Sequence, residues 1–284
     1  MPRGVPKAGF RMTRKRKAQG HAKLQMPAIA IESTETEAQI RAKLDERFAA
    51  LTLMTEAAVA GEVRSFVISG PAGLGKSYGV TQTLERERPY YTIVRGYVRP
   101  TGLYKTLYEY RAPGSVVVFD DADAIFGDEA ALNLLKAACD TTRRRVLSWL
   151  TETKMEDEAG DRLPTSFEFE GTIIFITNYD FDSMIDRGSK LSPHFNALIS
   201  RSMYLDMKMK NKKDYLVRIK QVIEQGMLRN EGLSDVAEKQ IVNFVEKHQD
   251  SLRELSLRMV VKVASLYKSH PVQWQNLARV VCCK

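Results

Sequence analysis

A glycine-rich loop over Gly70–Ser77, with the sequence GPAGLGKS, constrains the fold of this chain more than any other feature. It matches the phosphate-loop pattern of a glycine, four residues, then Gly-Lys-Ser, in which backbone amides turn inward toward phosphate oxygens. The apolar run over 63–70 predicts a buried strand before the loop, and the residues over 76–87 predict a helix after it. A simple glycine turn is the alternative, but this strand–loop–helix context is the one that phosphate binding requires.

The loop predicts a site for ATP and Mg²⁺. Lys76 has the reach to contact the β- and γ-phosphates, and the Ser77 hydroxyl is a suitable ligand for Mg²⁺. The helix that follows offers its positive N-terminus to the anion. The nucleotide-binding residues expected from the loop are Gly70, Pro71, Ala72, Gly73, Leu74, Gly75, Lys76 and Ser77.

A second polar feature is the pair Asp120 and Asp121, which follows the apolar residues SVVVF. A strand beside the phosphate loop would deliver Asp120 to the Mg²⁺ shell, together with Ser77, and Asp121 toward the attacking water. The alternative is a core strand that ends in a solvated turn. The phosphate loop earlier in the chain favours the nucleotide site, with Asp121 as a catalytic residue.

Strand-like and helix-like segments alternate through much of the chain, which predicts a parallel sheet covered by helices on both faces. A helix over about 36–60, with capping-box spacing at Thr34 and Glu37, precedes the first strand. The other expected strands lie at 90–96, 115–120 and 171–178, and the other expected helices at 102–110 and 129–140.

Three segments follow from these patterns. Residues 1–30 are expected to be a basic disordered tail, 31–208 the α/β domain, and 209–284 an all-helical domain. Within the α/β domain, 146–169 is expected to be a hairpin insertion. No apolar run approaches the roughly 18 residues that a membrane span requires, so we expect no membrane association and a cytoplasmic location.

The net charge of +8 is concentrated at the start of the chain, because the first 31 residues contain eight basic residues and no acidic one. Such a segment could make salt-sensitive contacts with a nucleic-acid backbone. A solubilising arm or a peptide that docks on a protein partner is the alternative.

Further motifs give the chain a specific resemblance. FITN ends the fourth strand at Asn178, NALISRSMYLDM contains Arg201, and LSLRMVVKV contains Arg258. With the phosphate loop and the acidic strand before them, these motifs make the chain similar to AAA+ ATPases over about 60–270. The resemblance implies a P-loop parallel sheet followed by a small all-helical AAA+ lid.

The resemblance also implies roles for these residues. Asn178 would be the sensor-1 residue that positions the attacking water, Arg201 the finger that reaches the neighbouring subunit's γ-phosphate, and Arg258 the sensor-2 residue that touches the nucleotide. An arginine finger supplied by a neighbouring subunit implies an oligomer, most simply a hexameric ring or spiral. Each role has an alternative. Asn178 could cap a loop, and Arg258 could be a solvated residue. Arg201 could form a surface ion pair, in which case Arg187 would be the finger.

Asp121 departs from the glutamate that is commoner at this position of the family. Its side chain is one methylene shorter, which requires a shifted or water-mediated geometry and puts the turnover rate in question rather than nucleotide binding. Asp123 is expected to face solvent beyond the end of the strand.

The loop after the second strand, GYVRPTGLY, lies where AAA+ rings line their pore. Tyr97 and Val98 could grip a polypeptide, whereas Tyr97 and Arg99 could stack on a base and contact a phosphate; Tyr104 follows in the helix. An ordinary strand-to-helix connection is the alternative.

The insertion has an acidic tip, which suits a subunit contact or a basic protein better than DNA. The basic run Arg143–Arg145 before it could serve a neighbour's nucleotide, a nucleic-acid path or a solvated helix end.

The leading hypothesis is an AAA+ ATPase that hydrolyses ATP with Mg²⁺ and remodels or loads a nucleic-acid-processing assembly, similar to phage or helicase-loader ATPases. It would bind nucleic acid through the basic tail and the pore. A chaperone that acts on a polypeptide, and a monomeric P-loop kinase or nucleotide switch, are the alternatives.

Overall fold

The computed structural model describes residues 35–150, 155–156, 160–188 and 190–284. The expected basic tail over 1–30 and much of the acidic tip of the insertion lie outside the described residues. Within the described part of the chain, no helix has the length and apolar character needed to cross a membrane.

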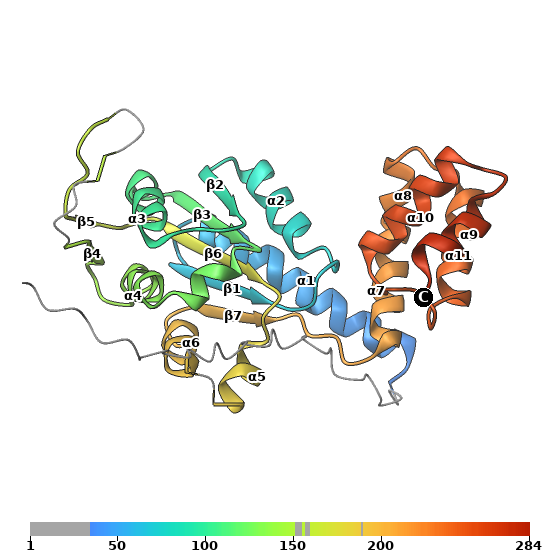
Figure 1. Cartoon of the computed structure of the whole chain (residues 1–284), viewed down its shortest axis with the longest axis horizontal. Coiled ribbons are helices and arrows are strands. Elements are labelled where there is room, and N and C mark those ends of the chain that lie inside the picture. The colour runs from blue at the N-terminus through green and yellow to red at the C-terminus, as the bar shows by residue number, and fades with distance from the viewer. Residues whose placement is uncertain (1–34, 151–154, 157–159, 189) are drawn as a thin grey trace, which may run out of the picture.

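The centre of the molecule is a five-stranded sheet in the order β2-β3-β6-β1-β7, and every neighbouring pair is parallel (Figure 1). All carboxyl ends of the strands therefore lie at the same edge. The register places Ser69 beside Thr177, and Asp120 between Arg95 and Ile176. The strands are β1 (Ser65–Ser69), β2 (Tyr90–Arg95), β3 (Ser115–Asp120), β6 (Thr172–Thr177) and β7 (Met203–Asp206).

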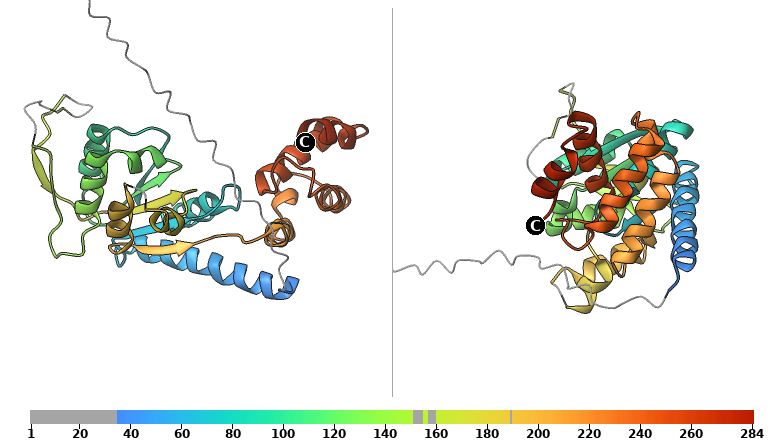
Figure 2. Two further views of the ribbon diagram at one scale, coloured as in Figure 1. Left: turned by 60° about the horizontal axis from the view of Figure 1, so that its bottom comes forward. Right: turned by 90° about the vertical axis from the view of Figure 1, so that its right-hand side faces the viewer.

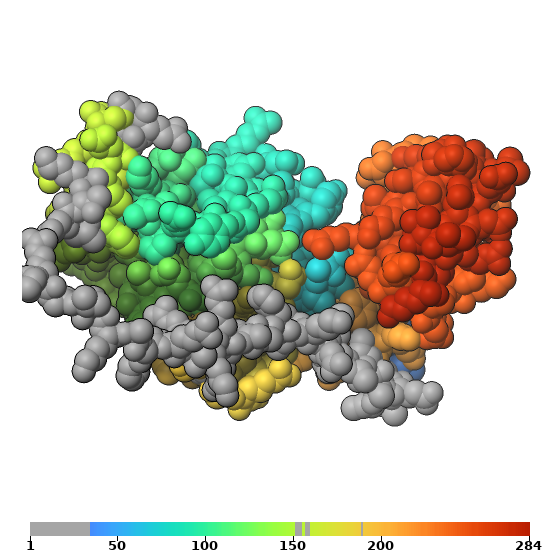
Figure 3. Space-filling model, in the orientation of Figure 1, coloured from blue at the N-terminus to red at the C-terminus, as the bar shows by residue number. Residues whose placement is uncertain are grey.

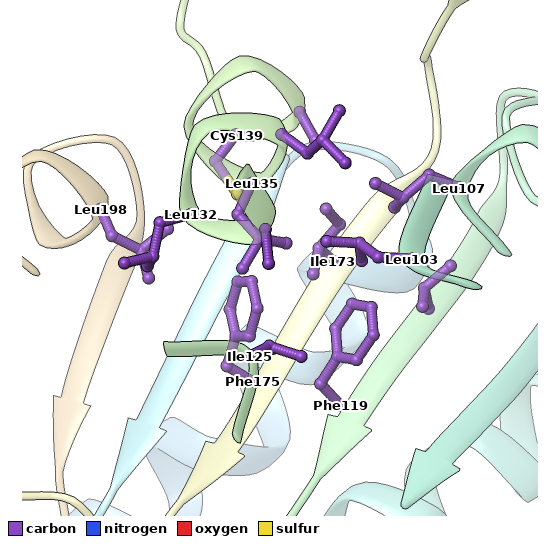
Figure 4. Close-up of a cluster of buried hydrophobic side chains, with 14 of the residues drawn as sticks. Leu103, Leu107, Phe119, Ile125, Leu132, Leu135, Cys139, Ile173, Phe175 and Leu198 are labelled. Carbon is purple, nitrogen blue, oxygen red and sulfur yellow. The ribbon is translucent and has the colours of Figure 1, made fainter. Parts of the chain in front are cut away.

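One face of the sheet carries an apolar core rich in phenylalanine. Alternate strand residues such as Phe119, Ile173 and Phe175 point to this face and pack under the helices that cover it (Figure 4). The covering elements are α3 (Pro100–Glu109), the 3₁₀ helix η1 (Asp123–Gly127), α4 (Glu129–Ala138), α5 (Phe181–Asp186) and α6 (Ser192–Ile199).

The opposite face is covered by α1 (Glu37–Val59) and α2 (Lys76–Glu87), whose apolar side chains pack on residues such as Phe66 and Ile174. Because both faces are covered, β1, β3 and β6 are buried along their whole length, and the residues between their polar ends are apolar. The expected α/β class, a P-loop parallel sheet followed by a helical lid, is confirmed.

The last part of the chain is a bundle of helices that stands beside the sheet (Figures 1 and 2). Its core includes Leu228, Ile241, Val260 and Trp274. Ser234 and Ser256 cap two of its helices by accepting hydrogen bonds from backbone amides. The helices are α7 (Lys212–Glu224), α8 (Met227–Asn230), α9 (Asp235–Lys247), α10 (Leu257–Ser269) and α11 (Trp274–Cys282).

Helix α7 belongs to both cores. Tyr215 and Val217 pack in the core beneath α1 and α2, whereas Ile219 and Ile223 pack in the core of the bundle. The expected boundary at 208/209 therefore falls before a helix that the two parts share, and the division of the chain into domains remains a proposal.

Helix α1 runs along the sheet and reaches α7 at its N-terminal end (Figure 2). Arg41 donates two hydrogen bonds to Glu224 of α7, at 2.7 and 3.1 Å. The helix begins after Thr36, which forms a capping box with Gln39. The capping box expected at Thr34 and Glu37 was therefore misplaced by two residues.

The insertion forms a short antiparallel ribbon at its base, β4 (Val146–Ser148) with β5 (Ser166–Glu168). Glu156 and Arg162 form an isolated bridge nearer the tip. Six elements were missing from the sequence-based description: η1, α5, α6, β7, α8 and α11. They are short, between four and nine residues, which leaves little room for a periodic apolar pattern.

Candidate functional site

The phosphate loop connects β1 to α2 in a conformation that depends on glycine. Gly73 has φ +76°, and a Cβ there would lie 2.7 Å from the Cβ of Ser256, the N-cap of α10. The backbone amide of Leu257 also donates to the carbonyl of Gly73 at 2.9 Å. The loop is thus in direct contact with the helical bundle, and only a glycine fits at this point.

Lys76 is the first residue of α2 and is buried within the loop. Its ammonium group donates to the carbonyls of Gly70 and Pro71 and, at 3.2 Å, to Oδ1 of Asn178. Burial lowers the pKa of Lys76 to about 8, against the opposing effect of the nearby Asp121. The lysine is therefore held at the carboxyl edge of the sheet, beside the residue that follows β6.

Ser77 and Asp120 meet at the same edge. The Ser77 hydroxyl donates to Oδ1 of Asp120 at 2.7 Å, and the Asp120 residue is only 5% exposed. A hydroxyl and a carboxylate are the hard oxygen ligands that Mg²⁺ prefers. These two side chains fit the metal expected with a nucleotide triphosphate, and we assign them as its candidate ligands.

Asp121 has a left-handed backbone with φ +53°, uncommon for a residue other than glycine. This conformation turns its side chain out of the strand. Its Oδ1 accepts a hydrogen bond from Nδ2 of Asn178 at 2.8 Å, and its Oδ2 lies 3.8 Å from Nη2 of Arg258. The acid after β3, the amide after β6 and the arginine of α10 are therefore brought together.

Asp123 does not face solvent, which corrects the expectation from the sequence. Its Oδ1 accepts a hydrogen bond from the Thr177 hydroxyl at 2.6 Å, and the residue is partly buried. Burial raises the pKa of Asp123. The side chain is committed to the end of β6 and leaves Asp121 as the exposed carboxylate of the pair.

A cavity of about 620 Å³ lies between the phosphate loop and the helical bundle. A hollow between these two parts is visible in the space-filling view (Figure 3). Lys76, Ser77, Asp121, Asn178 and Arg258 all line it. Its volume is typical of small-molecule sites, and its lining combines apolar side chains with a cluster of polar groups.

Arg201 is remote from this cavity. It precedes β7, and its carbonyl accepts a hydrogen bond from Ser65 at the start of β1, so it lies at the amino edge of the sheet. Its Nη1 donates to the carbonyl of Ala197 at 2.8 Å, and its Nε is buried without a hydrogen-bond partner among the described residues. Arg187, the alternative finger, is exposed after α5. The structure does not bring Arg201 to the nucleotide site of its own chain.

The loop after β2 presents Tyr97, which is 75% exposed. Arg99 is exposed as the N-cap of α3, and Val98 packs against the sheet core. Tyr104 is completely buried and donates a hydrogen bond to the carbonyl of Pro164. Tyr104 thus lies in a helix, as expected, and its side chain belongs to the core rather than to the exposed loop.

The three arginines of the basic run Arg143–Arg145, which precedes the insertion, lie in three different environments. Arg145 is buried and donates to the carbonyls of Ala138 and Gly171. Arg144 forms an ion pair with Glu168 of the adjacent strand. Only Arg143 is left as an exposed side chain without a hydrogen bond or ion pair among the described residues, so the run does not form a continuous basic surface.

Two residues at the site were not identified from the sequence. Arg95, the last residue of β2, donates from Nε to Oδ2 of Asp120 at 3.0 Å. Arg218 of α7 lines the cavity beside Leu74. An arginine at the end of a predicted parallel strand, and one among the apolar residues of a predicted helix, are the signals that could have found them.

Arg95 shares the Asp120 carboxylate with the expected metal. We predict that Arg95→Gln lowers the Mg²⁺ concentration for half-maximal ATPase activity by about two- to five-fold, because an exposed ion pair competes only modestly. Arg95 is 60% exposed, and Asp120 is the acid that it contacts. A titration of activity against Mg²⁺ measures this shift. Arg99→Gln removes the same charge without contacting Asp120 and serves as the control; equal shifts in both variants would contradict the prediction.

No protein-family model matches the chain. Its sequence is 35% identical over 252 residues to an uncharacterized 36.7 kDa protein of Enterobacteria phage T4 from the nrdC-mobD intergenic region. The match covers 87% of this chain and 77% of the phage protein. The chain belongs to the family of this phage protein.

Solved structures with a similar chain include a RuvB mutant from Thermotoga maritima, at 15% identity and a TM-score of 0.48, covering 85% of this chain and 70% of that one. NtrX from Brucella abortus in complex with ATP is similar at 14% identity and a TM-score of 0.44, over 88% of this chain and 53% of that one.

The fold and the positions of the motif residues agree with the resemblance to AAA+ ATPases. The loop after β1, the acidic end of β3, the amide after β6 and an arginine of the helical bundle meet around the same cavity. This arrangement agrees with the resemblance to AAA+ ATPases, and the activity and the roles of the individual site residues are the subject of the proposal that follows.

Proposed function

We propose that the protein is an Mg²⁺-dependent ATPase that assembles into a ring or spiral and remodels or loads a nucleic-acid-processing assembly. The observation that carries the hydrolytic part is the cluster of Asp121, Asn178 and Arg258 beside Lys76. A nucleotide switch that only binds needs no exposed carboxylate held by an amide and an arginine.

Within this proposal each residue has a task derived from its position. Lys76 and the phosphate-loop amides bind the β- and γ-phosphates, and Arg258 stabilises the γ-phosphate end of the cavity. Asn178 orients Asp121 by the hydrogen bond at 2.8 Å. Asp121 accepts the proton of the attacking water. When bound by Ser77 and Asp120, Mg²⁺ supplies charge stabilisation on the phosphate oxygens.

The oligomer is supported by the position of Arg201. Its guanidinium lies at the amino edge of the sheet, whereas the nucleotide site lies at the carboxyl edge of the same chain. A contact between Arg201 and a γ-phosphate therefore requires a second subunit. We propose a hexameric ring or spiral in which each site receives the arginine of its neighbour.

Nucleic acid as the substrate is supported by two observations. The basic excess of the chain is concentrated in its first 31 residues, with eight positive charges and no negative one. In the loop after β2, the exposed Tyr97 lies two residues from the exposed Arg99, a combination suited to stacking on a base and binding a phosphate. The same tyrosine could hold an unfolded polypeptide, which is the alternative substrate.

The decisive experiment measures the ATPase rate of the purified protein alone and with single-stranded DNA, duplex DNA or an unfolded polypeptide. We expect DNA to stimulate the rate and the polypeptide to leave it unchanged. Stimulation by the polypeptide alone would replace the nucleic-acid hypothesis by the chaperone hypothesis, and an absence of hydrolysis under all conditions would leave a nucleotide switch.

The basic segment makes a separate prediction. Deleting residues 1–24, which removes all eight of these basic residues, should lower DNA affinity at low salt by about ten-fold or more and flatten its salt dependence, because fewer counterions are released on binding. Fluorescence anisotropy over a salt series measures both quantities. A full-length variant with the eight residues replaced by Gln controls for chain length; unchanged affinity in both variants would remove this segment from the binding surface.

A further inference from the structure

Arg218 is an unusual residue in the wall of the nucleotide cavity. It lies on α7, is only 7% exposed, and faces the same cavity as Lys76 and Arg258. Arginine is almost never this deeply buried without a partner for its charge. The function derived above for the phosphate loop and for α10 makes no use of it.

The contacts of Arg218 hold its guanidinium group against the phosphate loop. Its Nε donates to the carbonyl of Leu74 at 3.3 Å, and its Nη2 lies 3.6 Å from the position that a Cβ would take at Gly75, the N-cap of α2. Phe48 of α1 supports the group from beneath, because the guanidinium carbon lies 3.3 Å from the centroid of its ring.

The charge of Arg218 has no compensating carboxylate. Among the described residues, no acid forms an ion pair with it, and Asp45, whose charge attracts it, accepts a hydrogen bond from Gln221 instead. Burial lowers the pKa of Arg218 to about 10, so the group is still protonated at neutral pH. A buried cation without a partner destabilises the folded protein. A buried charged group that lines a cleft is therefore a candidate for a functional role, and a positive group can bind an anion there.

The position of Arg218 separates it from Arg258. Arg258 lies near Asp121, at the end of the cavity where we place the γ-phosphate. Arg218 lies beside Leu74 and Gly75, at the start of α2, and the same face of α7 continues along the cavity with Val222 and Gln225. Amides at a helix start of this kind hold the phosphates nearer the base in phosphate-loop sites.

We infer that Arg218 binds the nucleotide through a phosphate group that ATP and ADP share. Helix α7 thereby contacts the nucleotide whether or not the γ-phosphate is present, whereas α10 contacts it through Arg258 only at the γ-phosphate end. This inference rests on the proposed function, since it takes a nucleoside di- or triphosphate as the occupant of the cavity.

Arg218→Met tests the inference in the full-length protein, because methionine preserves much of the apolar stem and removes the charge. Without nucleotide, its melting temperature should equal or exceed that of the wild type, since an uncompensated buried charge is removed. Its affinity for a fluorescent ADP analogue should fall by about ten- to hundred-fold, the loss typical of a hydrogen bond to a charged group. The stabilisation that ADP gives in thermal unfolding should shrink accordingly.

Two further variants sharpen the test. Lys220→Met removes a positive charge from the same helix, but Lys220 pairs with Glu246 and does not line the cavity, so ADP affinity should not change. Arg258→Gln should weaken ATP binding more than ADP binding, whereas Arg218→Met should weaken both to a similar extent. Should Arg218→Met fail to fold, Arg218→Gln retains a donor for the carbonyl of Leu74 and should show the same loss of ADP affinity.

A purely structural role for Arg218 would give the opposite pattern. The melting temperature without nucleotide would fall, and ADP affinity would remain that of the wild type; this result, in either Arg218 variant, would overturn the inference. A wild-type protein that binds neither ADP nor ATP would overturn the proposed function as well. If the wild type binds ADP and both Arg218 variants bind it equally well, only the inference about Arg218 is overturned.

Discussion

Replacing Asp121 by Asn is expected to lower the kcat of ATP hydrolysis by about 10²-fold or more, the contribution typical of a general base. Asparagine has nearly the same shape as aspartate and tolerates the left-handed backbone of φ +53° at this position. It keeps an oxygen for the hydrogen bond from Asn178 but cannot accept a proton from water. ATP affinity should stay the same or improve slightly, because a negative charge beside the γ-phosphate is removed.

Steady-state kinetics together with a binding assay separate these two effects. Asp123→Asn is the matched control, since Asp123 is a neighbouring carboxylate whose hydrogen bond to Thr177 keeps it away from the cavity. We expect a much smaller change in kcat for this control. Undiminished turnover in Asp121→Asn would show that another group activates the water and would reduce Asp121 to a partner of Asn178 and Arg258.

Replacing Arg201 by Ala is expected to lower kcat by about 10³-fold or more while ATP binding is retained, because an arginine finger stabilises the transferring phosphoryl group and not the bound ground state. The side chain packs at the amino edge of the sheet, where its Nε has no hydrogen-bond partner among the described residues. Among the described residues, the hydrogen bond from its Nη1 to the carbonyl of Ala197 is the interaction that the replacement would break. Arg187→Ala, at the alternative finger, should have little effect on kcat.

Mixing variants tests whether Arg201 acts on a neighbouring subunit. Arg201→Ala retains an intact phosphate loop, and Lys76→Met retains an intact arginine, so each is inactive for a different reason. Co-assembly should restore part of the activity at interfaces where an intact loop meets an intact arginine. If the mixture stays inactive although light scattering shows co-assembly, Arg201 does not act in trans.

Much of the nucleotide site could be predicted because its parts are defined by short-range pattern. The phosphate loop has its own spacing, and Asp120 and Asn178 each end an apolar run. In a parallel sheet all such ends lie at one edge, so their proximity to Lys76 follows once the strands are recognised. The hydrogen bonds from Lys76 to Asn178 and from Asn178 to Asp121 agree with that reasoning.

The parts that escaped prediction depend on long-range packing. Arg95 contacts Asp120 only because β2 lies next to β3 in the sheet. The sequence of neither strand determines this order. Arg218 reaches Leu74 only because α7 packs between α1 and the phosphate loop. Local pattern identifies the ends of elements, and tertiary packing decides which ends meet.

The shared helix α7 has a consequence for synthesis on the ribosome. The core beneath α1 contains Ile40 near the start of the described chain and Val217 near the middle of α7. A chain made from its N-terminus cannot close this core until α7 has emerged, so the growing polypeptide carries an open apolar surface through most of translation. Completion of the α/β part of the molecule is thus tied to the appearance of the helix that also lines the cavity beside the phosphate loop.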